Sequence, residues 1–363
     1  MASNEEEEYW ERQHKKSNRP ADTAFKQQRL TAWKPVFTIR STIPIFMGIG
    51  ALFLIVGGVL YGSVVSTKEI EVDYTTCESV EYQGTTCDSI VRGHNASIPR
   101  RTACTCRLNF TLEKNFGGTV FFYYKLTNFY QNHRRYVRSR NDGQLRGDLA
   151  SNGDCSPLAS RTLNITNAEN ASVLESRTIA PCGLIANSLF NDTLTLRVAS
   201  TQAVVNVTGR GIAWKSDHTT KFQNPTGDLA AAFGRYANPP NWPRSAAELD
   251  PSDPENNGFL NEDFIVWMRT AALPTFRKLY RKIPQGLNAG QYMLEVNYRF
   301  PTHGFDGKKI MVLSTISWLG GRNTFLGIAY LTVGTLSVAV SVAFLVLNGL
   351  SSGKWSLRQR DVL

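Results

Sequence analysis

Two long uncharged stretches lie near the ends of the chain and divide it into parts. One uncharged window covers Ser41–Thr67 and the other covers Asn323–Gly353. A helix needs about 20 apolar residues to cross the hydrocarbon core of a bilayer. A charge at the centre of such a helix would cost about 2.5–3.5 kcal/mol on insertion scales, and both windows lack one. The pattern therefore predicts two transmembrane helices, at 43–67 and 323–350.

The chain between these stretches has the pattern of a folded domain. Four runs predict strands because they alternate apolar and polar residues or are rich in aromatic residues: Glu69–Tyr74, Thr119–Leu126, Gln291–Phe300 and Lys309–Ser317. Asp263–Ile283 fits both a helix and a strand, and Asn141–Ala180, rich in Ser, Asn and Gly, predicts loops or an insertion. The 255 residues of 68–322 can bury their own core. We expect a membrane protein with two transmembrane α-helices around a β-rich, antiparallel sandwich-like ectodomain with short helices.

Basic residues beside the two spans predict the orientation of the chain. Lys15–Arg40 holds seven basic residues and one acid, and Lys354, Arg358 and Arg360 follow the second span. Cytoplasmic flanks carry an excess of Lys and Arg, so both tails are predicted to be cytoplasmic. The predicted parts outside the membrane are a cytoplasmic tail with a juxtamembrane motif at 1–42, a lumenal or extracellular ectodomain at 68–322 and a cytoplasmic tail at 351–363.

All six cysteines follow the first span, and their even number suggests disulfides formed in an oxidising compartment. Cys104 and Cys106 would face the same way in a strand, so we do not expect them to bond to each other. The first four cysteines still allow three pairings. A zinc site is the rival interpretation, with His94 nearby, but the chain has no C-x-x-C pair. Six N-x-S/T sequons predict glycosylation at Asn95, Asn109, Asn164, Asn170, Asn191 and Asn206.

Neither the net charge nor the motifs point to nucleic acid or to an enzyme. The net charge is +10, but the basic residues are scattered without zinc-finger or helix-turn-helix spacing. Acidic lipid surfaces suit the tails better. The Asp-Lys-Thr-Gly phosphorylation motif of ATP-driven pumps and the P-loop are absent, and a G-x-S-x-G match at Gly349–Gly353 lies at the end of a predicted membrane helix. Glu262 and Asp263 fit a helix start better than a glycosidase pair. We expect no catalytic residue, cofactor or metal.

Three groups of residues are candidates for binding a partner. In the tail segment Thr23–Pro35, the large apolar residues and nearby cations suit either membrane-surface anchoring or docking onto a partner: Phe25, Lys26, Arg29, Leu30 and Trp33. In the first span, small residues allow another helix to approach closely: Gly50 and Gly57 on nearly the same face, and the pair Gly58 and Gly62. In Asn128–Arg140, four basic residues suit either an anionic headgroup or acids of the ectodomain or of a partner: His133, Arg134, Arg135 and Arg138.

Several of these segments resemble the noncatalytic two-span beta subunit of phospholipid flippases, the partner of type IV P-type ATPases. The match covers Thr23–Arg29 and Ala32–Trp33 in the tail, and departs at Thr31, where the family commonly has proline. The further matching blocks are NFYQNHRRYVRSR (Asn128–Arg140), PCGLIANSLFNDT (Pro181–Thr193), GIAWKSD (Gly211–Asp217), DFIVWMRTAALPTFRKLYRKI (Asp263–Ile283) and GKKIMVLSTISWLGGRN (Gly307–Asn323). They follow one another in order over residues 20–335.

The resemblance implies an accessory subunit rather than an enzyme. It implies nested disulfides, Cys77 with Cys106 and Cys87 with Cys104, and then Cys155 with Cys182. It also implies a heterodimer with a catalytic ATPase, whose stability, export from the endoplasmic reticulum and inward translocation of aminophospholipids the subunit would support. The expected locations are endoplasmic reticulum, Golgi, endosomal and plasma membranes. The alternative is a membrane-anchored receptor or adhesion ectodomain without a transport role, which would not need a patterned cytoplasmic segment.

Overall fold

A computed structural model describes residues 20–32, 38–93, 103–151, 153–166 and 172–360. The chain divides into two compact units, which we treat separately. One consists of Met1–Gly57 and Ala329–Leu363, and the other of Gly58–Ile328. The first holds most of both membrane helices, and the second is the ectodomain with the adjoining helix ends.

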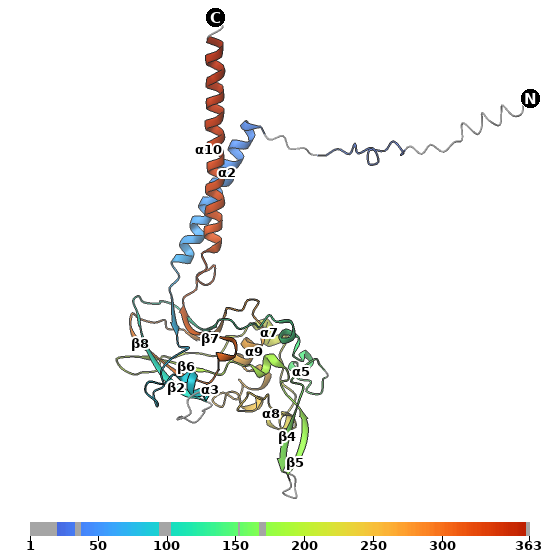
Figure 1. Cartoon of the computed structure of the whole chain (residues 1–363), viewed down its shortest axis with the longest axis vertical. Coiled ribbons are helices and arrows are strands. Elements are labelled where there is room, and N and C mark those ends of the chain that lie inside the picture. The colour runs from blue at the N-terminus through green and yellow to red at the C-terminus, as the bar shows by residue number, and fades with distance from the viewer. Residues whose placement is uncertain (1–19, 33–37, 94–102, 152, 167–171, 361–363) are drawn as a thin grey trace, which may run out of the picture. The chain divides into compact units, whose positions relative to one another are not determined.

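The helices and strands are numbered in the order in which they occur along the chain, and Figure 1 labels some of them. The strands are β1 (Glu69–Asp73), β2 (Cys104–Leu112), β3 (Val120–Leu126), β4 (Ser160–Thr166), β5 (Ser172–Thr178), β6 (Thr193–Val198), β7 (Phe276–Ile283), β8 (Gly290–Tyr298) and β9 (Lys309–Ser314). The long helices are α2 (Ile39–Val65) and α10 (Phe325–Arg360). The short helices are α3 (Cys87–Arg92), α4 (Arg134–Arg138), α5 (Asp142–Leu145), α6 (Leu184–Asn187), α7 (Lys215–Thr220), α8 (Leu229–Phe233) and α9 (Glu262–Met268), with 3₁₀ turns η1 (Ala246–Glu248), η2 (Gly258–Leu260) and η3 (His303–Phe305).

Both predicted spans are helices that are long and apolar enough to cross a membrane, over Ile39–Val65 and Phe325–Leu350. Large apolar side chains such as Leu52, Ile55 and Leu336 are exposed on them. Their outer faces therefore suit hydrocarbon rather than water. α10 continues to Arg360, so the segment predicted as a separate C-terminal tail is helical over most of its length.

Two antiparallel sheets build the ectodomain. One has the strand order β1-β9-β3-β7 and the other β2-β8-β6. Along β3, alternate residues from Val120 to Leu126 are buried, which leaves one face of the strand for the core. Buried residues of both sheets, such as Phe122 in β3 and Leu294 in β8, belong to one hydrophobic cluster. The four predicted strands are confirmed, and the shared core confirms the sandwich-like arrangement.

The prediction of loops over Asn141–Ala180 is wrong. This region contains α5 and the hairpin β4–β5, whose strands pair from Ser160↔Thr178 to Thr166↔Ser172. The hairpin projects from the rest of the ectodomain (Figure 1). The described side chains of β5 are mostly exposed, so these strands can be rich in Ser, Thr and Asn. Their composition therefore resembles that of loops.

The ambiguous segment Asp263–Ile283 is a helix followed by a strand. The Asn261 side chain accepts a hydrogen bond from the Phe264 amide, which caps the start of α9. At its other end, the Lys278 ammonium group from β7 donates to the carbonyls of Val266, Trp267 and Arg269 at 2.7–2.9 Å. Three donors to three carbonyls fix the end of the helix against the strand.

Candidate partner-binding surfaces

Within the membrane-helix unit, the two helices touch through glycines. A Cβ atom added at Gly50 would lie 2.7 Å from Val338, and one at Gly57 would lie 2.9 Å from the Leu331 backbone. From α10, Gly334 is equally close to Leu54, where an added Cβ would lie 3.0 Å from the backbone nitrogen. Small residues bring the two backbones this close, which maximises van der Waals contact where hydrocarbon provides no hydrophobic driving force.

The buried positions recur every seven residues along each helix. They are Gly50, Gly57 and Val64 on α2, and Gly327, Gly334 and Ser341 on α10. A repeat of seven keeps one face of an α-helix turned to its neighbour when the pair winds gently in a left-handed supercoil. Gly50 and Gly57 therefore serve a contact within the chain. Their predicted contact with another protein stays a prediction, beside this contact within the chain.

The second pair of glycines lies on a different face. A Cβ atom added at Gly58 or Gly62 would meet nothing within 4 Å. The helix–helix contact found in the structure therefore does not use the predicted Gly58-x-x-x-Gly62 pair. This face of α2 remains free to receive a helix from another protein.

The N-terminal tail exposes its described apolar residues. A turn over Thr23–Arg29 is closed by a bond from the Arg29 amide to the Ala24 carbonyl, and the Arg29 side chain pairs with Asp22. Phe25 and Leu30 are 76% and 61% exposed, and Lys26 is also exposed. Trp33 lies outside the described residues. An exposed apolar pair on this segment fits both predictions, contact with a membrane surface and contact with a partner.

The predicted basic group lies on one short helix of the ectodomain. His133 precedes α4, and all four side chains, His133, Arg134, Arg135 and Arg138, are exposed. Tyr136 from the same helix is partly buried, and its hydroxyl lies 2.8 Å from the Ser188 hydroxyl, which anchors α4 to α6. None of the four forms an ion pair with an acid among the described residues. Among the described residues, the structure therefore contains no ion pair between these cations and acids of the ectodomain. An anionic headgroup and acids of a partner stay as the predicted contacts.

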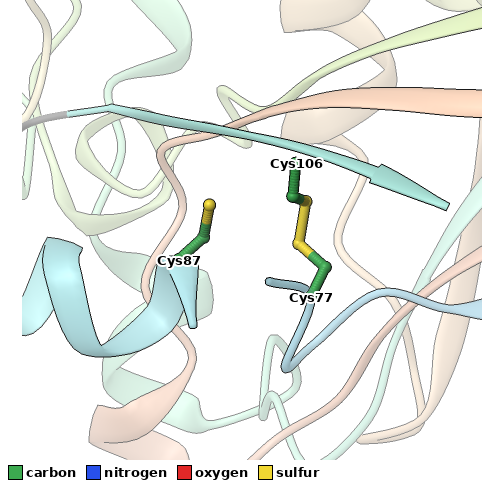
Figure 2. A group of neighbouring side chains, drawn as sticks. All are labelled: Cys77, Cys87 and Cys106. Atoms are coloured by element: carbon green, nitrogen blue, oxygen red, sulfur yellow. A yellow bond between two sulfur atoms is a disulfide. The ribbon is translucent and has the colours of Figure 1, made fainter. Parts of the chain in front are cut away.

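Three disulfides cross-link the ectodomain: Cys77–Cys106, Cys87–Cys104 and Cys155–Cys182. This is the nested pairing that the resemblance implies. Figure 2 shows the Cys77–Cys106 bond beside Cys87, and the sulfur atoms of these three residues lie within 4.8 Å of one another. Such a trio could hold a metal only as thiolates. Since all six cysteines are in disulfides, the zinc interpretation does not fit the oxidised chain.

The predicted glycosylation sites differ in their surroundings. Asn109, Asn164 and Asn206 are exposed. Asn191 is half-buried, and its Oδ1 atom has no hydrogen-bond partner among the described residues. Asn95 and Asn170 lie outside the described residues. All six remain predictions.

One buried ion pair of the ectodomain has no signal in the sequence. Lys309 Nζ lies 2.6 Å from Asp192 Oδ2, and both side chains are 0% exposed. Lys309 also donates to the Phe300 carbonyl at 2.7 Å and lies 3.0 Å from the centre of the Tyr298 ring. Burial lowers the pKa of the Lys309 ammonium group to about 8, while the Asp192 carboxylate acts against that shift. The carboxylate 2.6 Å away favours the charged form of the lysine, so the two groups form a buried ion pair.

No described histidine has the surroundings of a catalytic base. In the described chain, the imidazoles of His133, His218 and His303 make no hydrogen bond to a hydroxyl, thiol or carboxylate. The Asp263 carboxylate, which lines a cavity of the ectodomain, is held by Arg281 through bonds of 2.6 and 3.1 Å.

Comparison with known proteins gives a consistent result. The model of the LEM3 (ligand-effect modulator 3) family / CDC50 family matches residues 60–354. Cell cycle control protein 50A of Mus musculus is 47% identical over 350 residues, covering 92% of this chain and 90% of that protein. Cell cycle control protein 50B of Homo sapiens is 42% identical over 354 residues, covering 93% and 96%. The putative ALA-interacting subunit 2 of Arabidopsis thaliana is 39% identical over 331 residues, covering 89% and 86%.

The architecture and the comparisons agree. Two candidate membrane helices flank, in sequence, an ectodomain of antiparallel sheets that contains three disulfides. The family match covers most of the chain, including both helices in part. The chain therefore belongs to the LEM3/CDC50 family, the two-span beta subunits of phospholipid flippases.

Proposed function

We propose that this chain assembles one-to-one with a type IV P-type ATPase as its noncatalytic subunit. It stabilises the ATPase, enables its export from the endoplasmic reticulum and supports inward translocation of aminophospholipids. Family membership supports this proposal, and one relative is named as an ALA-interacting subunit. The observation that carries it is the division of glycines on α2, where α10 covers Gly50 and Gly57 while Gly58 and Gly62 stay open. Two helices packed directly on each other enclose no path for a lipid, so a transport role requires a partner.

Three surfaces share the proposed contact with the ATPase. The tail residues Phe25, Lys26, Arg29, Leu30 and Trp33 act on the cytoplasmic side, and Gly58 and Gly62 act within the membrane. The basic residues of α4 act on the ectodomain side. The complex occupies the endoplasmic reticulum, Golgi, endosomal and plasma membranes, with the ectodomain on the lumenal or extracellular side.

The open glycine pair provides the direct test. We expect Gly58→Leu with Gly62→Leu to reduce about tenfold the amount of ATPase that co-purifies with the tagged chain. A tenfold loss corresponds to roughly 1.4 kcal/mol of binding free energy. The bulk of leucine would hold the partner helix away. The control is Ile49→Phe, which adds bulk at an exposed residue about half a turn around α2 from Gly58, and it should leave recovery unchanged. Equal recovery with the double variant and with the control would reject the proposed membrane contact.

A swap experiment separates this function from that of a receptor. Both tails and both helices are replaced with those of an unrelated two-span protein, and the ectodomain is kept. An accessory subunit should lose the ATPase, and the ATPase should then remain in the endoplasmic reticulum. Normal export of the ATPase with the swapped chain would favour the receptor or adhesion reading.

The basic residues of α4 allow a second prediction. Arg134→Gln with Arg138→Gln should lower ATPase recovery while changing the stability of the ectodomain by less than about 0.5 kcal/mol, because no ion pair within the described chain is lost. Co-purification and thermal unfolding of the full chain measure the two effects. Lys215→Gln with Arg235→Gln removes two other exposed cations and serves as the control. Unchanged recovery would remove α4 from the proposed interface.

A further inference from the structure

A cavity of about 430 Å³ lies where the ectodomain joins the two membrane helices. All of its lining residues belong to the ectodomain unit. The lining comes from the end of α2, the start of β1, the end of β2 with the chain after it, and the segment before α10. Pockets of about 300–1,000 Å³ are typical of small-ligand sites. This cavity is therefore large enough for a small polar group with part of an attached chain.

The cavity lies beside the ends of the two predicted membrane spans, at Val65 and Arg322. Lys68, just after α2, is hydrogen-bonded to Thr315, just after β9. The Lys68 amide donates to the Thr315 hydroxyl at 2.9 Å, and the Thr315 amide donates to the Lys68 carbonyl at 2.9 Å. Close by in sequence, the Trp318 indole donates to the Ser63 hydroxyl of α2 at 3.1 Å, and its side chain is 74% exposed. Exposed tryptophans with one polar atom satisfied are typical of the interface between hydrocarbon and headgroups.

Positive charge predominates in the lining. Three cations, Lys68, Lys114 and Arg322, line the cavity with two acids, Glu69 and Glu113. The Glu69 carboxylate is neutralised by Arg277, whose guanidinium lies 2.7 Å away. Lys114 and Arg322 form no ion pair within the described residues. Three cations thus face the Glu113 carboxylate, the acid of the lining that has no ion-pair partner among the described residues.

A buried hydroxyl in the wall also lacks a partner. Thr67 lines the cavity and is only 5% exposed, yet its Oγ1 atom makes no hydrogen bond within the described chain. A buried polar group left unsatisfied costs about 1–3 kcal/mol, so such groups usually meet a ligand or a water. The hydroxyl can donate to an oxygen held by the neighbouring cations.

From these observations we propose that the cavity binds the phosphate group of a membrane glycerophospholipid. Lys68, Lys114 and Arg322 compensate its charge, and the Thr67 hydroxyl donates to a phosphate oxygen. The acyl chains lie along the apolar surface that begins at Val65, at the end of α2. The inference concerns this chain alone and does not depend on an ATPase partner. A free phosphate ion has the same chemistry, but it would leave the apolar side of the site unused.

The test uses the purified full-length chain in detergent, titrated with phosphatidylglycerol and followed by native mass spectrometry. We expect Lys114→Gln with Arg322→Gln to weaken binding of the first lipid about tenfold, since charge-assisted hydrogen bonds to phosphate are the strong ones. Thr67→Val, which keeps the shape and removes the hydroxyl, should weaken it about threefold. Lys215→Gln with Arg235→Gln loses the same charge outside the cavity and should bind like the unmodified chain.

Two outcomes would overturn the proposal. One is equal binding by the cavity variants and the control variant. The other is displacement of the lipid by inorganic phosphate at concentrations near that of the lipid, which would assign the cavity to a free anion. Thermal unfolding of each variant, measured in parallel, separates loss of binding from loss of folding, and Thr67→Val is the variant least able to disturb the fold.

Discussion

Replacing Lys309 with methionine is expected to destabilise the ectodomain by about 3–5 kcal/mol, because it leaves the carboxylate of Asp192 buried without its cation. Lys309 and Asp192 are fully buried, 2.6 Å apart. Methionine has nearly the length of lysine, so little of this loss comes from a cavity. The midpoint of urea unfolding, followed by tryptophan fluorescence of the full chain in detergent, measures the effect.

The neighbouring residue is a matched control. Lys308 pairs with Asp73 at 3.6 Å, but its side chain is 67% exposed. Because exposed ion pairs contribute about 0–1 kcal/mol, Lys308→Met should leave the urea midpoint nearly unchanged. Equal midpoints for the two single variants would show that burial of the Lys309 ion pair has no special role.

A second substitution should rescue the first. Asp192→Asn removes the buried charge but keeps an oxygen for the amides of Arg299 and Phe300, which donate to the carboxylate at 2.6 Å. We therefore expect Lys309→Met with Asp192→Asn to regain at least half of the lost stability. The sequon at Asn191 survives this change, since its middle position accepts asparagine. No gain from the second substitution would attribute the loss to packing alone.

The second large effect concerns the Cys77–Cys106 disulfide. Removing both cysteines as Cys77→Ser with Cys106→Ser should cost about 3–4 kcal/mol, since the bond closes a loop with a sequence separation of 29 residues. The single variant Cys77→Ser should fold even less well. It leaves a free thiol at Cys106, within 4.8 Å of the Cys87 sulfur, and this thiol can attack the Cys87–Cys104 bond.

Peptide mapping without reduction distinguishes these cases. The single variant should contain a Cys87–Cys106 bond and a free Cys104, whereas the double variant should keep Cys87–Cys104. Cys155→Ser with Cys182→Ser breaks a loop of nearly equal separation, 27 residues, in a separate small cluster, and should leave the Cys77 and Cys87 pairs intact. A single Cys77→Ser variant with native Cys87–Cys104 pairing and the double variant's stability would contradict this account.

Local patterns in the sequence predict the elements that depend on neighbouring residues. The two apolar stretches and the alternation in β1, β3, β8 and β9 are each read within one run of residues, and the structure confirms them. The Ser-rich and Thr-rich hairpin β4–β5 was missed because its described side chains have few partners to bury against. The glycines of α10 that contact α2, Gly327 and Gly334, were also missed, although their spacing of seven repeats that of Gly50 and Gly57.

Features made from distant segments could not be read from the sequence. Asp192 and Lys309 are 117 residues apart, and only the folded sheets bring them together. The cavity beside the membrane helices draws its cations from three segments, at Lys68, Lys114 and Arg322, which look like ordinary surface charges in sequence. No local periodicity links such residues, since their proximity depends on the pairing of strands.

The central claim is that this chain works as one half of a complex with a catalytic ATPase. The most direct measurement is affinity purification of the tagged full-length chain from native membranes in mild detergent, followed by quantitative mass spectrometry. The account predicts one large type IV P-type ATPase in about equal molar amount, and retention of that ATPase in the endoplasmic reticulum when this chain is depleted. Recovery of the chain without such an ATPase, together with normal export of the ATPase after depletion, would contradict it.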